Sequence, residues 1–96
     1  MATFITLATF TDQGVRGIND TTKRADTFRE QAKGAGLTVR EIFWTMGQYD
    51  LVVITEAQDE RTAAGALMKL AAQGNVRTQT LPAFSKDEIN AMLGVR

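Results

Sequence analysis

Residues 43–54 (FWTMGQYDLVVI) constrain the fold more than any other stretch of this chain. Two runs rich in aromatic and β-branched residues, which favour strands, flank Gly47. Because glycine adopts backbone conformations that strain other residues, the chain can reverse direction there. The pattern therefore predicts a β-hairpin in the middle of the chain, with strands at residues 37–46 and 49–56.

The segment before the hairpin predicts a strand followed by helix. Residues 2–10 are dense in β-branched and aromatic residues and apolar on both faces, as in a strand that is covered on both sides. From Thr11 the apolar period becomes helical, with a break expected near Asp20, and Gly34 and Gly36 end the helix. The expected apolar stripe consists of Val15, Ile18, Thr22, Ala25, Phe28 and Ala32.

The segment after the hairpin repeats this order. Asp59 is expected to cap a helix at residues 60–73, which Gly74 stops. A fourth strand is predicted at residues 76–81, and Pro82 should end its pairing or lie at a sheet edge because proline has no N–H to donate. The buried face of the helix is expected to contain Ala63, Leu67, Leu70 and Ala71.

The last predicted element is a short helix with a clear start signal. Ser85 and Glu88 have the spacing of a capping box, while Phe84 and Ile89 occupy the staple positions on either side. Such a short amphipathic helix after the core elements is typical of an interaction arm.

The order strand–helix–strand–strand–helix–strand with right-handed crossovers predicts a single ferredoxin-like α+β domain over residues 1–96. Its four-stranded antiparallel sheet would have both helices on one face. The other face would be too apolar for a soluble monomer, so we expect dimerisation through it, in a dimeric α+β barrel. Some of the following side chains should point there: Phe4, Phe10, Phe43, Trp44, Val52 and Ile54.

Composition narrows the possible chemistry. The chain has no cysteine and no histidine, which excludes disulfides, thiolate nucleophiles, the usual acid/base near neutral pH and the commonest transition-metal ligand. No tight acidic cluster suggests a hard-metal site, so we expect neither metal nor cofactor. The 11 basic and 11 acidic residues balance, which indicates no nucleic-acid or anionic-membrane partner. Without a leader or an apolar span, a cytoplasmic protein is expected.

Four segments in order resemble the GYD-domain family. They are residues 10–14 (FTDQG), 23–25 (KRA), 44–50 (WTMGQYD) and 74–80 (GNVRTQT). Pro82 departs from the pattern, because a basic residue is expected at that position. The resemblance implies a ferredoxin-like fold and assembly through the sheet, but no established activity. The hairpin is also similar to that of the small-molecule-sensing domains of Lrp/AsnC-type regulators, an analogy at the level of the fold alone.

The candidate ligand-binding or hairpin residues are Trp44, Thr45, Gly47, Tyr49, Asp50, Arg24 and Arg77. Asp50 has two interpretations: a turn carboxylate that accepts backbone N–H groups, or a partly buried acid at the mouth of a pocket, paired with Arg24 or Arg77. Tyr49 suits a subunit interface, and Trp44 suits a core, an interface or the orientation of a ligand. If both arginines point into one cavity, they would bind a carboxylate or phosphate.

Two functions from different classes follow. The first is a homo-oligomeric small-molecule-binding or interaction module of the GYD type, with a small anionic or apolar ligand near the hairpin and further copies of itself as partners. The alternative is a cofactor-independent enzyme, similar to monooxygenases or isomerases of the dimeric α+β barrel type. In that enzyme Asp50 would act as acid/base and an arginine as oxyanion stabiliser. A purely structural hairpin is the third possibility.

Overall fold

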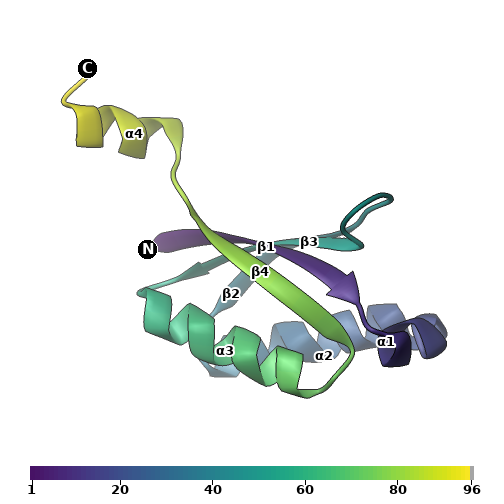
Figure 1. The fold of residues 1–96 in the computed structure, drawn as a ribbon. Coiled ribbons are helices and arrows are strands. Elements are labelled where there is room, and N and C mark those ends of the chain that lie inside the picture. Colours follow the sequence, from purple (N-terminus) through teal and green to yellow (C-terminus); the bar gives the residue numbers. More distant parts are fainter. Residues whose placement is uncertain (96) are drawn as a thin grey trace.

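The computed structural model describes residues 1–95 and contains one antiparallel sheet with helices packed on one of its faces (Figure 1). The elements in chain order are β1 (Ala2–Phe10), α1 (Asp12–Arg16), a 3-10 turn (Ile18–Asp20), α2 (Thr21–Gly34), β2 (Thr38–Trp44), β3 (Leu51–Ala57), α3 (Glu60–Ala72), β4 (Val76–Ala83) and α4 (Lys86–Leu93). The break predicted near Asp20 is the 3-10 turn.

The strands lie in the order β2-β3-β1-β4, and each neighbouring pair is antiparallel. β1 is therefore central, and its Ile5 lies opposite both Ile54 of β3 and Leu81 of β4. This arrangement confirms the predicted ferredoxin-like fold. The hairpin strands are shorter than predicted, because residues 45–50 form a loop instead of continuing the ladder.

The core lies between the sheet and α2 and α3. Alternate residues of β1 and β3 point toward the helices, as the pleat requires, and these side chains are Phe4, Thr6, Ala8, Val53, Thr55 and Ala57. Against them the helices bury Phe28, Ala32, Ala63, Ala66 and Leu67. Thr6 bonds to Thr80, whereas the buried Oγ1 of Thr55 has no hydrogen-bond partner among residues 1–95.

The predicted helical stripes are correct only in part. Phe28 and Ala32 are buried. Val15 and Ile18 are exposed, because α1 and the 3-10 turn are separate from α2 and do not continue its axis, and Thr22 in the first turn of α2 is exposed as well. On α3, Ala63 and Leu67 are buried as predicted. Leu70 and Ala71 are half-buried, and the prediction missed Ala66, which lies on the buried face.

Side-chain caps begin the helices where the sequence indicates. The carboxylate of Asp59 accepts a hydrogen bond from the backbone N–H of Thr62 at 2.8 Å, and this bond lowers the pKa of Asp59. Ser85 and Glu88 form the predicted capping box at the start of α4, and the bond from the Ser85 N–H lowers the pKa of Glu88. Among residues 1–95, no helix combines the length and apolar character needed to cross a membrane.

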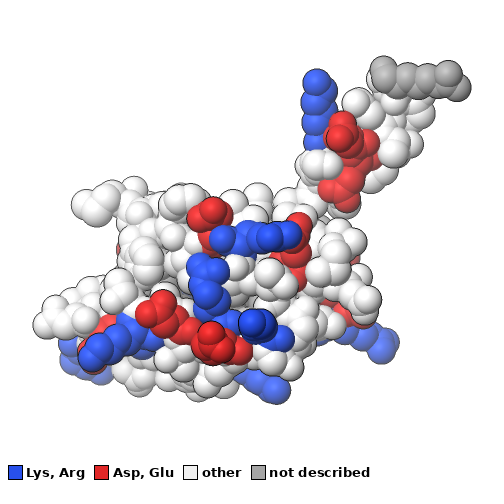
Figure 2. All heavy atoms as spheres, turned by 180° about the vertical axis from the view of Figure 1, so that it is seen from behind, with Lys and Arg blue, Asp and Glu red and all other residues white. Residues whose placement is uncertain are grey.

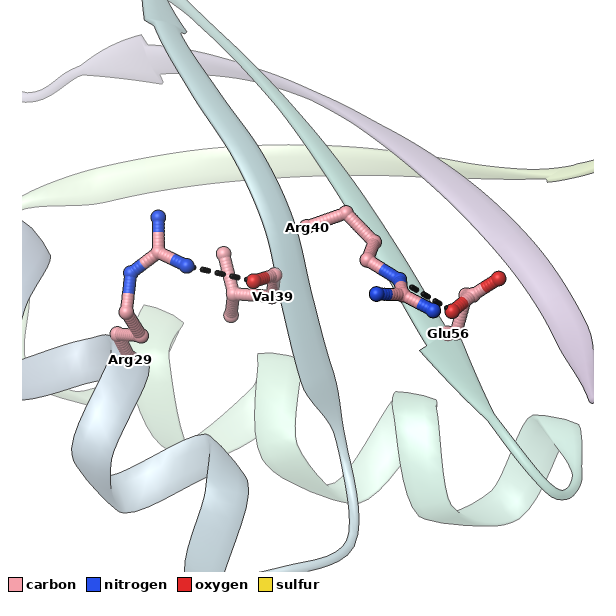
Figure 3. Close-up of polar contacts among 4 residues, drawn as sticks. All are labelled: Arg29, Val39, Arg40 and Glu56. Atoms are coloured by element: carbon pink, nitrogen blue, oxygen red, sulfur yellow. Dashed lines mark hydrogen bonds and ion pairs between the residues drawn. The ribbon is translucent and has the colours of Figure 1, made fainter.

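Two arginine contacts tie the edge strand β2 to its neighbours (Figure 3). The register shifts between Val39 and Glu41, so that Arg40 lies in a bulge and its Nε contacts Oε1 of Glu56 at 2.5 Å. From α2, Nη1 of Arg29 donates to the carbonyl oxygen of Val39 at 2.6 Å. The Arg29 bond occupies a carbonyl group of the edge strand, whereas the Arg40–Glu56 contact joins β2 to its neighbour β3.

Candidate functional site

Two hydrogen bonds between its ends close the β2–β3 loop. The Thr45 N–H donates to the carbonyl oxygen of Asp50 at 2.8 Å, and its hydroxyl donates to the carbonyl oxygen of Tyr49 at 2.6 Å. Gly47 has a φ of 128°, a region that side-chain-bearing residues rarely adopt. The glycine therefore permits this loop in the way the sequence predicts.

Asp50 joins the loop to the central strand. Its Oδ2 accepts a hydrogen bond from the Phe10 N–H at 2.9 Å, and its own N–H donates to the carbonyl oxygen of Ala8 at 2.8 Å. The hydrogen-bond partner of the carboxylate within residues 1–95 is thus a backbone N–H at the end of β1, and neither Arg24 nor Arg77 bonds to it. This geometry is that of a carboxylate holding a turn in place.

Trp44 and Arg24 lie on the helix-covered side of the sheet. The indole N–H of Trp44 donates to Oγ1 of Thr21 at 3.0 Å. Nη1 and Nη2 of Arg24 donate to the carbonyl oxygens of Gly17 and Gly14 at 2.5 and 3.2 Å. Arg24 therefore holds the segment containing α1 against α2 through two bonds to backbone carbonyl oxygens.

Both residues line a small cavity between the sheet and α2. Its volume is about 50 Å³, and its wall is mainly apolar, with Phe28, Ile42 and Leu51 among the lining residues. Pockets that bind small organic molecules usually enclose about 300–1,000 Å³, so this cavity has room only for a few water-sized groups.

Tyr49 and Arg77 lie on the opposite side of the sheet. Tyr49 Oη donates to Oε1 of Gln79 at 3.3 Å, and Gln79 lies between Thr78 and Thr80, whose side chains point toward the helices. Arg77 alternates with the buried Val76 and is exposed. The two candidate arginines therefore do not share a cavity, and the structure does not gather the set of residues expected of an enzyme.

We call the side of the sheet away from α2 and α3 the open face. Its apolar side chains form two adjacent rows across the strands, and they are Ile5, Leu7, Phe43, Val52, Ile54 and Leu81. In one row Ile5 lies between Ile54 and Leu81, and in the next Val52 lies between Leu7 and Phe43. Phe43 and Leu81 at the edges are 50% and 42% exposed.

The prediction expected some of six named residues on the open face, and three of the six lie there. Phe43, Val52 and Ile54 point there, as expected. Phe4 is buried under the helices, and Phe10 and Trp44 line the small cavity on the same side. Their strands have apolar side chains on both faces, so the sequence does not reveal which alternate set is covered. The missed members were Ile5, Leu7 and Leu81, and the alternation with Phe4 and Ala8 is the signal that identifies the first two.

Charge is mixed on the surface seen from behind. Figure 2 shows Lys and Arg side chains interleaved with Asp and Glu on that face, rather than a patch of one sign. Nowhere in the described chain do three Asp or Glu side chains gather as ligands of a metal ion would.

The structure is similar to three solved structures of other proteins. It matches a feast or famine regulatory protein from M. tuberculosis, solved in complex with L-methionine, with a TM-score of 0.67 at 16% identity, over 90% of this chain and 52% of the other. The match to FFRP-DM1 has a TM-score of 0.62 at 20% identity over 88% of this chain and all of that one. TTHA0845 from Thermus thermophilus gives 0.55 at 24% identity, covering 88% and 95% of the two chains. At these identities the likeness establishes the fold, and this chain spans about half of the first regulator.

Sequence comparison is more specific. A Thermus thermophilus protein named as a glutamine synthetase and cystathionine beta-lyase binding protein is 35% identical over 94 residues, which are 97% of this chain and 99% of that protein. The model of the GYD domain matches residues 4–93. The chain therefore belongs to the GYD domain family.

Proposed function

We propose that this protein is a homo-oligomeric protein-interaction module that assembles through the open face. The observation that carries the proposal is the double row of apolar side chains on a side of the sheet that neither α2 nor α3 covers. An antiparallel sheet with one solvated face normally alternates apolar and polar residues, so that the solvated face is polar. Here the row through Ile5 is apolar on both sides of the central strand, and the row through Leu7 is apolar toward β3, where Val52 and Phe43 follow, and ends at the polar Gln79 of β4.

A second copy is a suitable cover for this surface. A closed dimer presents the same patch from both partners, so each apolar row meets an apolar row. Contiguous apolar patches of this kind on soluble proteins mark interaction sites. The edges of the patch, Phe43 and Leu81, still have about half of their surface to bury.

Binding of other proteins is supported by the relative from Thermus thermophilus, whose name states that it binds two enzymes and whose length matches this chain almost completely. A small-molecule ligand near the hairpin has less support, because the cavity beside Trp44 holds only about 50 Å³. The structural likeness to a methionine complex, at 16% identity, concerns the fold. We therefore favour protein partners over a small ligand.

The test is the oligomeric state of the full chain and of two charge variants, measured by light scattering coupled to size exclusion and by native mass spectrometry. Phe43→Glu places a carboxylate in the open face, and Val15→Glu is the matched control on α1, because Val15 is similarly exposed at 56% but lies outside that face. We expect the wild type and Val15→Glu to be oligomeric and Phe43→Glu to be monomeric. A monomeric wild type at tens of micromolar protein, or an unchanged Phe43→Glu, contradicts assembly through this face.

Partner binding is tested separately. Biolayer interferometry of the immobilised chain against glutamine synthetase and cystathionine beta-lyase from the same organism should show saturable binding to at least one. If neither enzyme binds while the chain is oligomeric, the role as a binding module for these two enzymes is wrong, and self-association is unaffected.

A further inference from the structure

The C-terminal helix α4 stands apart from the rest of the molecule. It follows β4 through Phe84 and Ser85, none of its residues is buried, and Figure 1 shows it on the side of the sheet opposite α2 and α3. The radius of gyration is 14.4 Å, whereas a compact chain of this length has about 12.5 Å. The projecting helix accounts for an elongated shape of 50 × 30 × 17 Å.

An isolated helix of eight residues is not stable in water, even with good caps. α4 has a capping box at its start and Gly94 in the left-handed conformation at its end. Ile89, Met92 and Leu93 form one apolar stripe along it and are exposed. The helix therefore has an exposed apolar stripe that can pack against an apolar surface, and within residues 1–95 of the single chain no such surface covers it.

The same chain has an apolar groove without an occupant. It lies between α3 and the edge strand β4 on the helix-covered side of the sheet and encloses about 350 Å³. Half of its lining residues have small side chains, which leave room for large ones, and these are Ala63, Ala64, Ala71, Thr78 and Thr80. The others are Phe4, Glu60, Leu67, Met68 and Pro82. A helix laid in such a groove with large residues at every third or fourth position is a recurrent mode of recognition.

We propose that α4 of each copy packs into the groove between α3 and β4 of a second copy of this chain. The proposal rests on the self-association proposed above. α4 projects on the side of the open face, where the second copy would sit, whereas the groove of its own chain lies on the other side of the sheet. A copy seated on the open face therefore lies on the side to which α4 projects. Because the groove of that copy is on its own helix-covered side, α4 enters it past the edge strand β4, and two-fold symmetry then supplies two helices and two grooves.

The absence of cysteine from the chain permits a direct test by cross-linking. Full-length chains carrying Met92→Cys on α4 are mixed with chains carrying Ala64→Cys in the groove and treated with a short bis-maleimide. Met92 is 59% exposed and Ala64 is also exposed, so neither change disturbs the core. The matched control pairs Met92→Cys with Ala72→Cys, since Ala72 is an exposed alanine on α3 that does not line the groove.

We expect the mixed dimer of Met92→Cys with Ala64→Cys, identified by its mass, to form several-fold faster than the mixed dimer with Ala72→Cys. If the two mixed dimers form at equal rates while the wild type is dimeric by light scattering, this inference is wrong and the proposed function is unaffected. If the wild type is monomeric and both pairs of cysteine variants cross-link only at the rate of random collision, the inference and the proposed function are both wrong. A chain carrying Met92→Cys and Ala64→Cys together that cross-links within itself at submicromolar concentration shows instead that α4 closes on its own groove.

A dissociation constant provides the second measurement. Met92→Glu should weaken the wild-type dimer by about a hundredfold, because each dimer loses two apolar contacts. Ala91→Glu, a change on the opposite side of α4, should leave the constant within about threefold. An equal effect of the two variants contradicts docking through the apolar stripe.

Discussion

Replacing Asp50 with alanine should lower the free energy of unfolding by about 2 kcal/mol. The carboxylate holds the β2–β3 loop against β1 through its bond to the Phe10 N–H at 2.9 Å. Loss of a hydrogen bond to a charged acceptor costs about 1.5–3 kcal/mol, and here it also leaves a half-buried N–H without its partner. The midpoint of thermal unfolding should fall by about 8–16 °C for a domain of this size.

Asp50→Asn is the discriminating variant. Its side-chain oxygen can still accept the Phe10 N–H, and the backbone bonds to Ala8 and Thr45 do not involve the side chain. Only the charge is lost, so we expect a decrease of about 1 kcal/mol or less. A structural carboxylate therefore predicts a graded series in which the wild type is most stable, asparagine is intermediate and alanine is least stable.

Urea unfolding followed by circular dichroism and by the fluorescence of Trp44, the single tryptophan, measures these differences. All variants are compared at one protein concentration, because the stability of an oligomer depends on concentration. If Asp50→Ala is within about 0.5 kcal/mol of the wild type, the bond to Phe10 does not hold the loop. If Asp50→Asn keeps its stability but loses binding to a protein partner or ligand, the carboxylate has a functional role as well.

Other predictions follow from single contacts. Gly14→Ala should destabilise the protein by about 1–3 kcal/mol in urea unfolding, because the new Cβ would clash with the backbone carbonyl oxygen of Asn75. Gly65→Ala, which meets nothing within 4 Å in the middle of α3, should stabilise it by about 0.5–1 kcal/mol, and equal effects of the two changes would contradict the packing. Thr55→Val should raise the free energy of unfolding by about 1 kcal/mol, since it removes a buried hydroxyl that has no partner among residues 1–95; a loss would reveal a bond to an ordered water. The pKa of Asp59 is lower in the folded protein than in the unfolded chain, so its carboxylate stabilises the fold above its unfolded pKa, and this stabilisation is lost as the pH falls through its folded pKa. Asp59→Asn keeps a cap but cannot titrate, so the free energy of unfolding should fall less steeply below about pH 4 in urea unfolding.

Local sequence signals predicted the elements because their causes are local. The N-cap at Asp59, the capping box at Ser85 and the positive φ of Gly47 depend on residues within a few positions along the chain. The order of the elements and the handedness of crossovers then determined the ferredoxin-like topology, which the structure confirms. Boundaries were less predictable: the predicted hairpin strands included Thr45, Met46, Tyr49 and Asp50, which the structure places in the loop between β2 and β3.

The candidate site was predicted as a set of residues but not as an arrangement. The sequence places Trp44 and Tyr49 close together along the chain, yet the structure directs them to opposite sides of the sheet. The same separation divides Arg24 from Arg77. No local pattern contains this information, because the side of the sheet to which a residue points depends on which face the helices cover.

The sequence by itself determined the family, the order of strands and helices, and the presence of more apolar strand surface than two helices can cover. Only the tertiary structure decided which of those side chains form the open face, that Asp50 bonds to the backbone of β1, and that α4 lies apart from the sheet and the other helices. The physical reason is that periodicity and capping act between neighbours in sequence, whereas sheet register, facing and the reach of α4 arise from contacts between segments far apart in the chain.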